Sequence, residues 1–132
     1  MPLVTSIDAK AGLATHTITG ELSLEDVMKA MVNLFTHPEF RPDMAILVDI
    51  SNGSAETLSQ EDIDEFVNLT RAMGEKRGSG RSAILAAKDL DYGIGRIIQA
   101  LLDDTTRDLR VFRDRDVCLQ WLLEPGHSQP RS

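Results

Sequence analysis

The sequence predicts an α/β domain with a mixed five-stranded sheet and about four helices, in the order β-β-α-β-α-β-α-β-α. Residues 44–50 and 82–87 are almost continuously apolar, which is typical of strands that helices cover on both faces. Amphipathic segments with helical periodicity separate these strands, and such alternation predicts right-handed crossovers and parallel pairing. Two consecutive strands at the start make the predicted sheet mixed.

The chain begins with two predicted strands and a helix. Residues 3–9 and 13–19 alternate as strands do, and residues 10–12 between them are typical of a turn. The helix that follows has Ser23 as its N-cap and ends before Pro38, because a residue that precedes proline avoids the α region. Its apolar residues fall on one helical face: Leu24, Val27, Met28, Met31, Val32 and Phe35.

Turn residues and helix caps divide the rest of the chain. Residues 51–54 predict a loop, Ser59 is the predicted N-cap of the second helix, and cations and glycines at 76–80 end that helix. The further predicted elements are a strand over 82–87, a helix over 92–103, a strand over 109–112 and a final helix that starts at Asp114. We expect one domain over 1–124 and a disordered polar tail over 125–132.

Composition argues against several classes of function. The chain has 132 residues, 42% of them hydrophobic, and a net charge of −7, whereas a general nucleic-acid binder needs a basic face. No apolar run is long enough to insert into a membrane, no secretory signal is recognisable, and Cys118 is the only cysteine, so we expect a cytoplasmic protein. No histidine has a second ligand at metal spacing, and the glycines at 78–80 follow a helix instead of a strand, so we expect no metal and no cofactor.

Polar residues at the end of the first apolar run form one candidate site. Ligands of open α/β sheets bind at the carboxyl ends of strands, where Asp49 is predicted. Ser51, Ser54 and Thr57 bring hydroxyl groups close to the N-terminus of the second helix, which would stabilise a phosphate. We expect a ligand or partner contact, or a modified hydroxyl, at this place. The alternative is a polar loop in which Asp49 bonds to the backbone.

The start of the third predicted helix forms a second candidate site. Lys88 and Arg96 add positive charge beside the N–H groups of the helix N-terminus, so a small anionic ligand could bind with Tyr92 nearby. Gly93 and Gly95 let a ligand or another backbone approach closely. The alternative is that the glycines allow the helix to pack on the sheet while Arg96 pairs with a surface acid.

Three short stretches, combined with this order of elements, resemble a known family. They are residues 46–50, which contain Asp49, the Tyr-Gly-Ile-Gly-Arg stretch at 92–96, and residues 111–114 with Trp121-Leu122 after them. Over about residues 3–123 the chain resembles the STAS domain family, which has the SpoIIAA-like fold, and more narrowly its small uncharacterised bacterial members. The resemblance implies a SpoIIAA-like sandwich and a regulatory domain that binds a protein partner or forms a homodimer, without catalysis.

The phosphorylation motif of that family, Asp-Ser-Ser/Thr-Gly, is absent from this sequence, and residues 51–59 stand in its place. The resemblance therefore implies the fold rather than the phosphorylation switch. A partner would bind the second helix and residues 49–59, whose acidic charge could steer a basic partner or, alternatively, only match the helix dipole. A third hypothesis is an enzyme in which Asp49, Lys88 and Arg96 share a cleft. Because no catalytic motif is present, we expect no enzyme.

The alternative function is that of a carrier. The CRAL-TRIO fold is linked by shape to the STAS-like proteins, and its members bind lipids between helix and sheet. By that analogy, a small apolar or lipid-like ligand would lie between the third helix and the sheet. The residues expected to hold it are Tyr92, Ile94, Ile97 and Met73.

Overall fold

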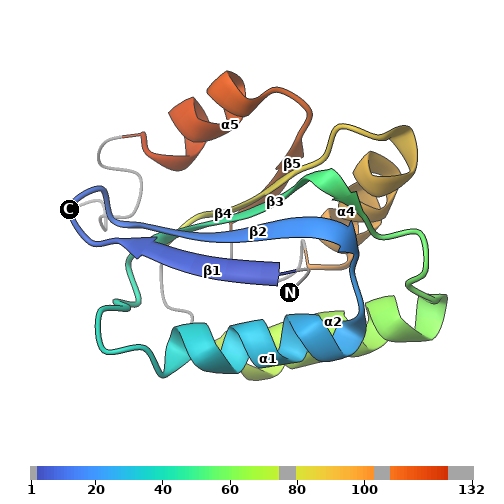
Figure 1. Ribbon diagram of the computed structural model, residues 1–132, viewed down its shortest axis with the longest axis horizontal. Helices are drawn as coiled ribbons and strands as arrows, with labels where there is room; N and C mark the ends of the chain where they lie inside the picture. Colours follow the sequence, from blue (N-terminus) through green and yellow to red (C-terminus); the bar gives the residue numbers. More distant parts are fainter. Residues whose placement is uncertain (1–2, 75–79, 103–107, 125–132) are drawn as a thin grey trace.

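We describe residues 3–74, 80–102 and 108–124 of a computed structural model (Figure 1). The elements of these residues are β1 (Leu3–Asp8), β2 (Leu13–Glu21), α1 (Leu24–Phe35), β3 (Ala45–Ser54), α2 (Gln60–Ala72), β4 (Ser82–Leu85), α4 (Asp89–Leu101), β5 (Leu109–Phe112) and α5 (Arg115–Leu122). Their order confirms the predicted one. The predicted tail over 125–132 and most of the helix stop predicted at 76–80 lie outside the described residues.

The strands form one mixed sheet in the order β1-β2-β3-β4-β5. β1 pairs with β2 in antiparallel fashion, and β2, β3, β4 and β5 run parallel, so β3 is the central strand. Figure 1 shows α1 and α2 on one side of the sheet and α5 on the other. α4 lies on the side of α1 and α2, because its Ile98 packs with Ile63 and Val67 of α2.

Successive residues of β3 face opposite layers, as the pleat of a strand requires. Leu47 packs against Cys118 and Leu122 of α5, whereas Ile46 packs against Leu34 of α1. Each of these five side chains is at most 6% exposed. The prediction that the first apolar run is covered on both faces is therefore confirmed.

β3 continues through residues 51–54, where the sequence predicted a loop, so that prediction is wrong. The pairing of β3 with β2 shifts its register between Thr17 and Thr19, after which Gly20 pairs with Gly53. This extension is held by the backbone pairing, which does not require apolar side chains. Gly53 also allows a close approach, since a Cβ there would lie 2.8 Å from the side chain of Ile18.

Short polar side chains cap three helices, at the predicted N-caps Ser23 and Ser59 and at Asp114, which was predicted as the first residue of the final helix. The Ser23 hydroxyl accepts a backbone N–H of the first turn of α1, and the Asp114 carboxylate does the same for α5. Ser59 and Asp62 form a capping box at the start of α2. Each such cap contributes about 1 kcal/mol to helix stability.

The helix α4 begins at Asp89, earlier than the predicted residue 92, and has no side-chain cap. Its Gln99 accepts a hydrogen bond from the backbone N–H of Val111 in the edge strand β5, with an N···O distance of 3.2 Å. This bond fixes α4 along β5. None of the described helices is long and apolar enough to cross a membrane.

Candidate functional site

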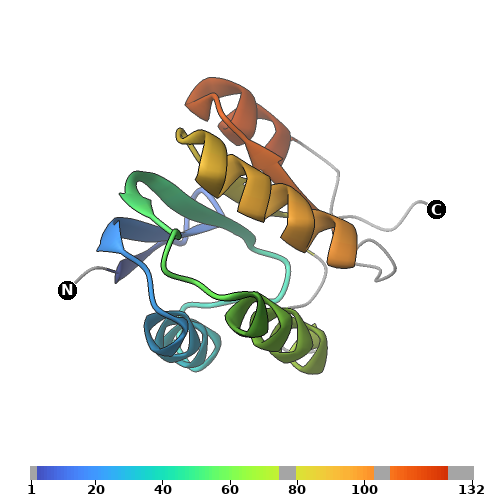
Figure 2. The ribbon, with the colours of Figure 1, turned by 90° about the vertical axis from the view of Figure 1, so that its right-hand side faces the viewer.

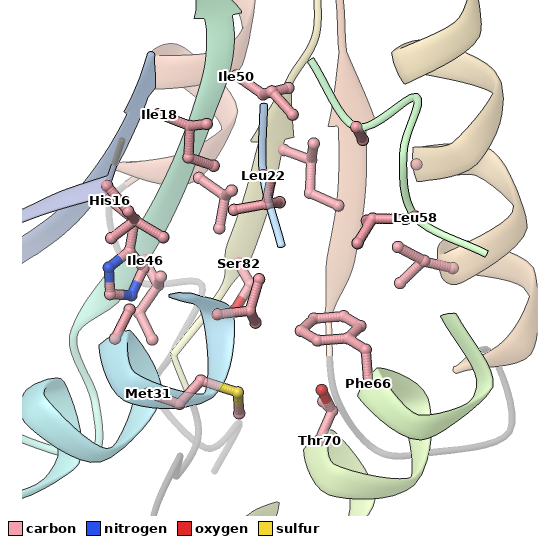
Figure 3. Close-up of a pocket in the computed structure, with 18 of the residues that line it drawn as sticks. His16, Ile18, Leu22, Met31, Ile46, Ile50, Leu58, Phe66, Thr70 and Ser82 are labelled. Carbon is pink, nitrogen blue, oxygen red and sulfur yellow. The ribbon is translucent and has the colours of Figure 1, made fainter. Parts of the chain in front are cut away.

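A cavity of about 150 Å³ lies between the sheet and the helices α1, α2 and α4. Figure 3 shows Met31 of α1 facing Phe66 and Thr70 of α2, with Ser82 of β4 on the side of the sheet. Most of the remaining lining is apolar, and it includes Leu22, Leu34, Ile46, Ile50, Ile63 and Ile98.

Small side chains on three surfaces leave this volume open. α1 and α2 lie side by side along one face of the sheet (Figure 2), and each presents a small residue to the cavity, Ala30 and Thr70 respectively. β4 presents Ser82, which lies beside Ile46 of β3 in the sheet register. The larger side chains around them are anchored in their own clusters, so they do not fill the space between the layers.

His16 of β2 is a polar residue in the cavity wall. Its ring is shown beside Ile46 in Figure 3, and the residue is 6% exposed. Nδ1 lies 2.7 Å from the hydroxyl oxygen of Thr5 in the neighbouring strand. Burial lowers the pKa of His16 to about 4, so the ring is neutral at pH 7. The cavity therefore carries no positive charge from this histidine under ordinary conditions.

Asp91 of α4 is a second polar residue in the cavity wall, and it is 3% exposed. Its Oδ1 accepts a hydrogen bond from the backbone N–H of Ala55 at 2.9 Å, which ties the first turn of α4 to the chain just after β3. Its Oδ2 is buried and has no hydrogen-bond partner among the described residues. A buried carboxylate oxygen without a donor is unfavourable, so this atom is a feature that needs a function or a further partner.

The sequence argument missed both residues, although Asp91 left a signal. Ile94 and Ile98 of α4 and its C-cap residue Leu102 form an apolar stripe, and the position three residues before Ile94 on that stripe is Asp91. An acidic residue on a buried helical stripe is unusual and indicates a special environment. His16 is likewise a polar residue among buried apolar ones, because Ala14, His16 and Ile18 lie on the same inward face of β2.

The carboxylate of the first predicted site, that of Asp49, lies on the opposite face of the sheet, beside α5. Asp49 is 6% exposed and lies within β3, not at its end, which corrects the predicted position. Its carboxylate pairs with Arg115 of α5 and accepts hydrogen bonds from the backbone N–H and the hydroxyl of Ser51. Burial raises the pKa of Asp49, but the bonds from Ser51 and Arg115 outweigh it and hold the pKa below its usual value. This group is therefore a charged link between β3 and α5.

The other two predicted hydroxyl groups make local contacts. The Ser54 hydroxyl accepts a hydrogen bond from the backbone N–H of Glu56 at 3.1 Å, and the Thr57 hydroxyl donates to the carbonyl of Leu22 at 3.4 Å. These bonds position the turn between β3 and α2. Phosphorylation at Ser51, Ser54 or Thr57 stays a prediction.

The residues of the second predicted site make their contacts in two different places. The ammonium group of Lys88 donates to the carbonyl of Gly53. The ring of Tyr92 is instead close to two guanidinium groups, those of Arg96 and Arg113, whose carbons are 6.0 and 5.2 Å from its centroid. Tyr92 and Arg96 line an open polar groove beside β5 together with Arg110. An anionic ligand in this groove stays a prediction.

The two glycines of α4 have different roles. A Cβ on Gly95 would lie 2.6 Å from the Cγ2 atom of Val111, so Gly95 allows α4 to pack closely on β5. A Cβ on Gly93 would have no heavy atom within 4 Å among the described neighbours. The close-packing alternative thus applies to Gly95.

The structure also separates the residues of the other two hypotheses. Of the expected carrier residues, Ile94 and Met73 line the cavity, but Ile97 is 44% exposed and Tyr92 lies with the arginines, so those two were wrongly placed. The three groups of the enzyme hypothesis have different partners. Asp49 pairs with Arg115, Lys88 with a backbone carbonyl, and Arg96 with Tyr92.

No protein-family model matches the sequence, and no curated protein matches it. Among solved structures, the chain is similar to an uncharacterised protein of the DUF3478 family with a SpoIIAA-like fold from Shewanella loihica PV-4. The two are 20% identical, the match covers 91% of each chain, and the TM-score is 0.59. At this identity the likeness concerns the fold alone. The fold is therefore SpoIIAA-like, as predicted from the sequence.

We predict opposite effects of alanine at the two glycines of α4. Gly95→Ala should lower the free energy of unfolding by about 1–3 kcal/mol, because its Cβ collides with Val111. Gly93→Ala should raise it by up to about 1 kcal/mol, because alanine is the better helix former and meets open space. Urea unfolding measures both values, and equal effects of the two substitutions would contradict the assigned packing.

We predict that His16 makes stability depend on pH. The unfolded histidine takes a proton near pH 6.5 and the folded one near pH 4, so the unfolded state binds more protons between these values and stability falls as pH falls. From pH 7 to pH 5 the loss should be about 2 kcal/mol. Unfolding of His16→Gln over the same range should lack this loss, whereas the exposed-site control His37→Gln should keep it. A similar loss in all three proteins would refute the assignment.

Proposed function

We propose that this protein is a STAS-like binding domain without catalysis, and that its cavity takes up a small apolar molecule or the apolar end of a lipid-like one. The observation that carries the proposal is the cavity between the sheet and the helical layer. This is the location expected for a carrier, although it extends under α1 and α2 as well as α4. The unpaired, fully buried Cys118 supports action in the reducing cytoplasm.

The size and lining of the cavity define the class of ligand. An apolar cavity of about 150 Å³ is large enough for a benzene-sized molecule. Leaving such a volume empty forfeits roughly 3–4 kcal/mol of packing and transfer free energy, which a fitting ligand recovers in part. Apolar side chains from β2, β3, α1, α2 and α4 would surround the ligand, so shape and burial would provide most of its affinity.

Exposed apolar side chains favour a second candidate function, self-association through α4. Leu90, Ile97 and Leu101 follow one another at helical spacing along this helix, and they are 53%, 44% and 39% exposed. Exposed apolar side chains gathered on one helical face are typical of interaction sites. We propose a second copy of this chain as the partner, in agreement with the homodimer that the family resemblance implies.

The carrier proposal is tested with toluene as the probe. At ten times its dissociation constant, toluene should stabilise the protein by about 1.4 kcal/mol and raise Tm by a few degrees. Ala30→Leu should weaken toluene binding at least tenfold, because the larger side chain occupies the cavity. Ala100→Leu, on the exposed side of α4, is the matched control and should bind as the wild type does.

Amide chemical shifts in NMR titrations locate the bound probe. Saturable shifts at Leu34, Ile46 and Ile98 would support the proposal. Shifts confined to surface residues, or equal affinity of the wild type and Ala30→Leu, would refute it.

The self-association candidate is tested by sedimentation velocity. The wild type should dimerise with rising concentration, and Ile97→Glu should weaken the dimer at least tenfold, because a charge on the apolar stripe must be desolvated. Met28→Glu is the matched control, since Met28 is exposed to a similar degree on α1. A monomeric wild type, or equal effects of both substitutions, would exclude an interface at α4.

A further inference from the structure

We propose that Asp91 selects cavity ligands whose apolar body carries a hydrogen-bond donor, either a hydroxyl or an ammonium group. This inference rests on the proposed ligand-binding function and extends it to the polar chemistry of the ligand. It starts from one atom, the buried Oδ2 of Asp91, and from the position of this residue in the cavity wall.

The fold fixes the orientation of the Asp91 carboxylate. Asp91 belongs to the first turn of α4, and its Oδ1 is held at 2.9 Å by the backbone N–H of Ala55. The residue is 3% exposed, so bulk water does not compensate for its polarity. Because one oxygen is bound to the backbone, the other has a set direction and no hydrogen-bond partner among the described residues.

A purely structural role accounts for one oxygen of the Asp91 carboxylate, Oδ1, but not for Oδ2. The bond to Ala55 needs one acceptor oxygen, which the amide of an asparagine would also supply without a second acceptor. Burying the second oxygen without a hydrogen bond costs free energy, and a hydrogen-bond donor would remove this cost. A ligand in the adjoining cavity is placed to bring that donor.

Two other polar residues of the cavity wall make hydrogen bonds with the protein itself. His16 uses Nδ1 for its contact with the Thr5 hydroxyl. Asp62 uses Oδ2 to accept the backbone N–H of Ser59 in the capping box. Asp91 differs from both in that one oxygen of the same carboxylate is fixed by the backbone and the other is buried without a hydrogen-bond partner among the described residues.

The chemistry of the acceptor determines which ligands are favoured. A ligand without a polar group would leave Oδ2 unsatisfied, and an anionic ligand would add repulsion. Sites built around a polar partner reject analogues that lack it far more strongly than apolar pockets reject a missing methylene. A benzene-sized body with a hydroxyl or ammonium group satisfies both the cavity and Asp91.

Four probes of equal apolar size test this inference on the wild type at pH 7: toluene, benzyl alcohol, benzylamine and benzoate. Titrations followed by NMR should show that benzyl alcohol, benzylamine or both bind at least about tenfold more tightly than toluene, and that benzoate binds most weakly. The tighter of the two donors identifies the hydroxyl or the ammonium group as the recognised chemistry.

Two variants then assign the preference to Asp91. Asp91→Asn keeps an oxygen for the N–H of Ala55 but replaces Oδ2 with a donor, so it should still bind toluene and lose at least about tenfold of the preference for the donor probes. Asp89→Asn removes the same charge from the same helical turn at a side chain that is 93% exposed, and it should retain the preference.

The outcomes separate this inference from the proposed function. If toluene binds as tightly as the donor probes, or benzoate binds best, Asp91 does not select donors, although the cavity still binds ligands. If no probe binds, the proposed function fails and the inference fails with it. The wild-type series decides these cases even if Asp91→Asn does not fold.

Discussion

The central strand β3 is the constraint on which the structure depends. It is bonded on both edges to parallel neighbours, and its side chains alternate between two buried layers. Parallel neighbours require crossover helices, and two buried faces require helices on both sides. Both requirements must be met within a single short chain. The result is a layer of three described helices on one face and α5 on the other.

This unequal covering makes the two faces of the sheet differ in how they are packed. On the face of α5, Leu47 meets the fully buried Cys118 and Leu122, and the ion pair of Asp49 with Arg115 closes the layer. The opposite face is covered by helices that come from different crossovers and leave a volume between them. The face of α5 is closely packed, and the opposite face contains the cavity in which the proposed ligand would lie.

Most of the fold could be predicted because buried positions are occupied mainly by apolar residues. The apolar runs identified β3 and β4, and helical stripes with polar caps identified the helices. The extension of β3 over residues 51–54 could not be predicted, because backbone pairing with β2 holds it and the side chains carry no pattern. The place of the cavity beside α4 was predicted in part, but its extension under α1 and α2 was not, because its lining includes small residues far apart in sequence, such as Ala30 and Ser82. Asp49 was recognised from the sequence as a candidate site residue, but its ion pair with Arg115 is evident only from the structure.

The bond between Gln99 and the N–H of Val111 restricts how this domain can assemble with others. Proteins often join by adding a strand to the edge of a sheet, and the incoming strand needs outward backbone groups for its own ladder. At β5 one of these groups is already taken by a side chain from α4, so strand addition is obstructed at that edge. A strand added from another molecule would therefore pair more readily with β1 at the far edge, and a partner at β5 would have to be recognised through side chains.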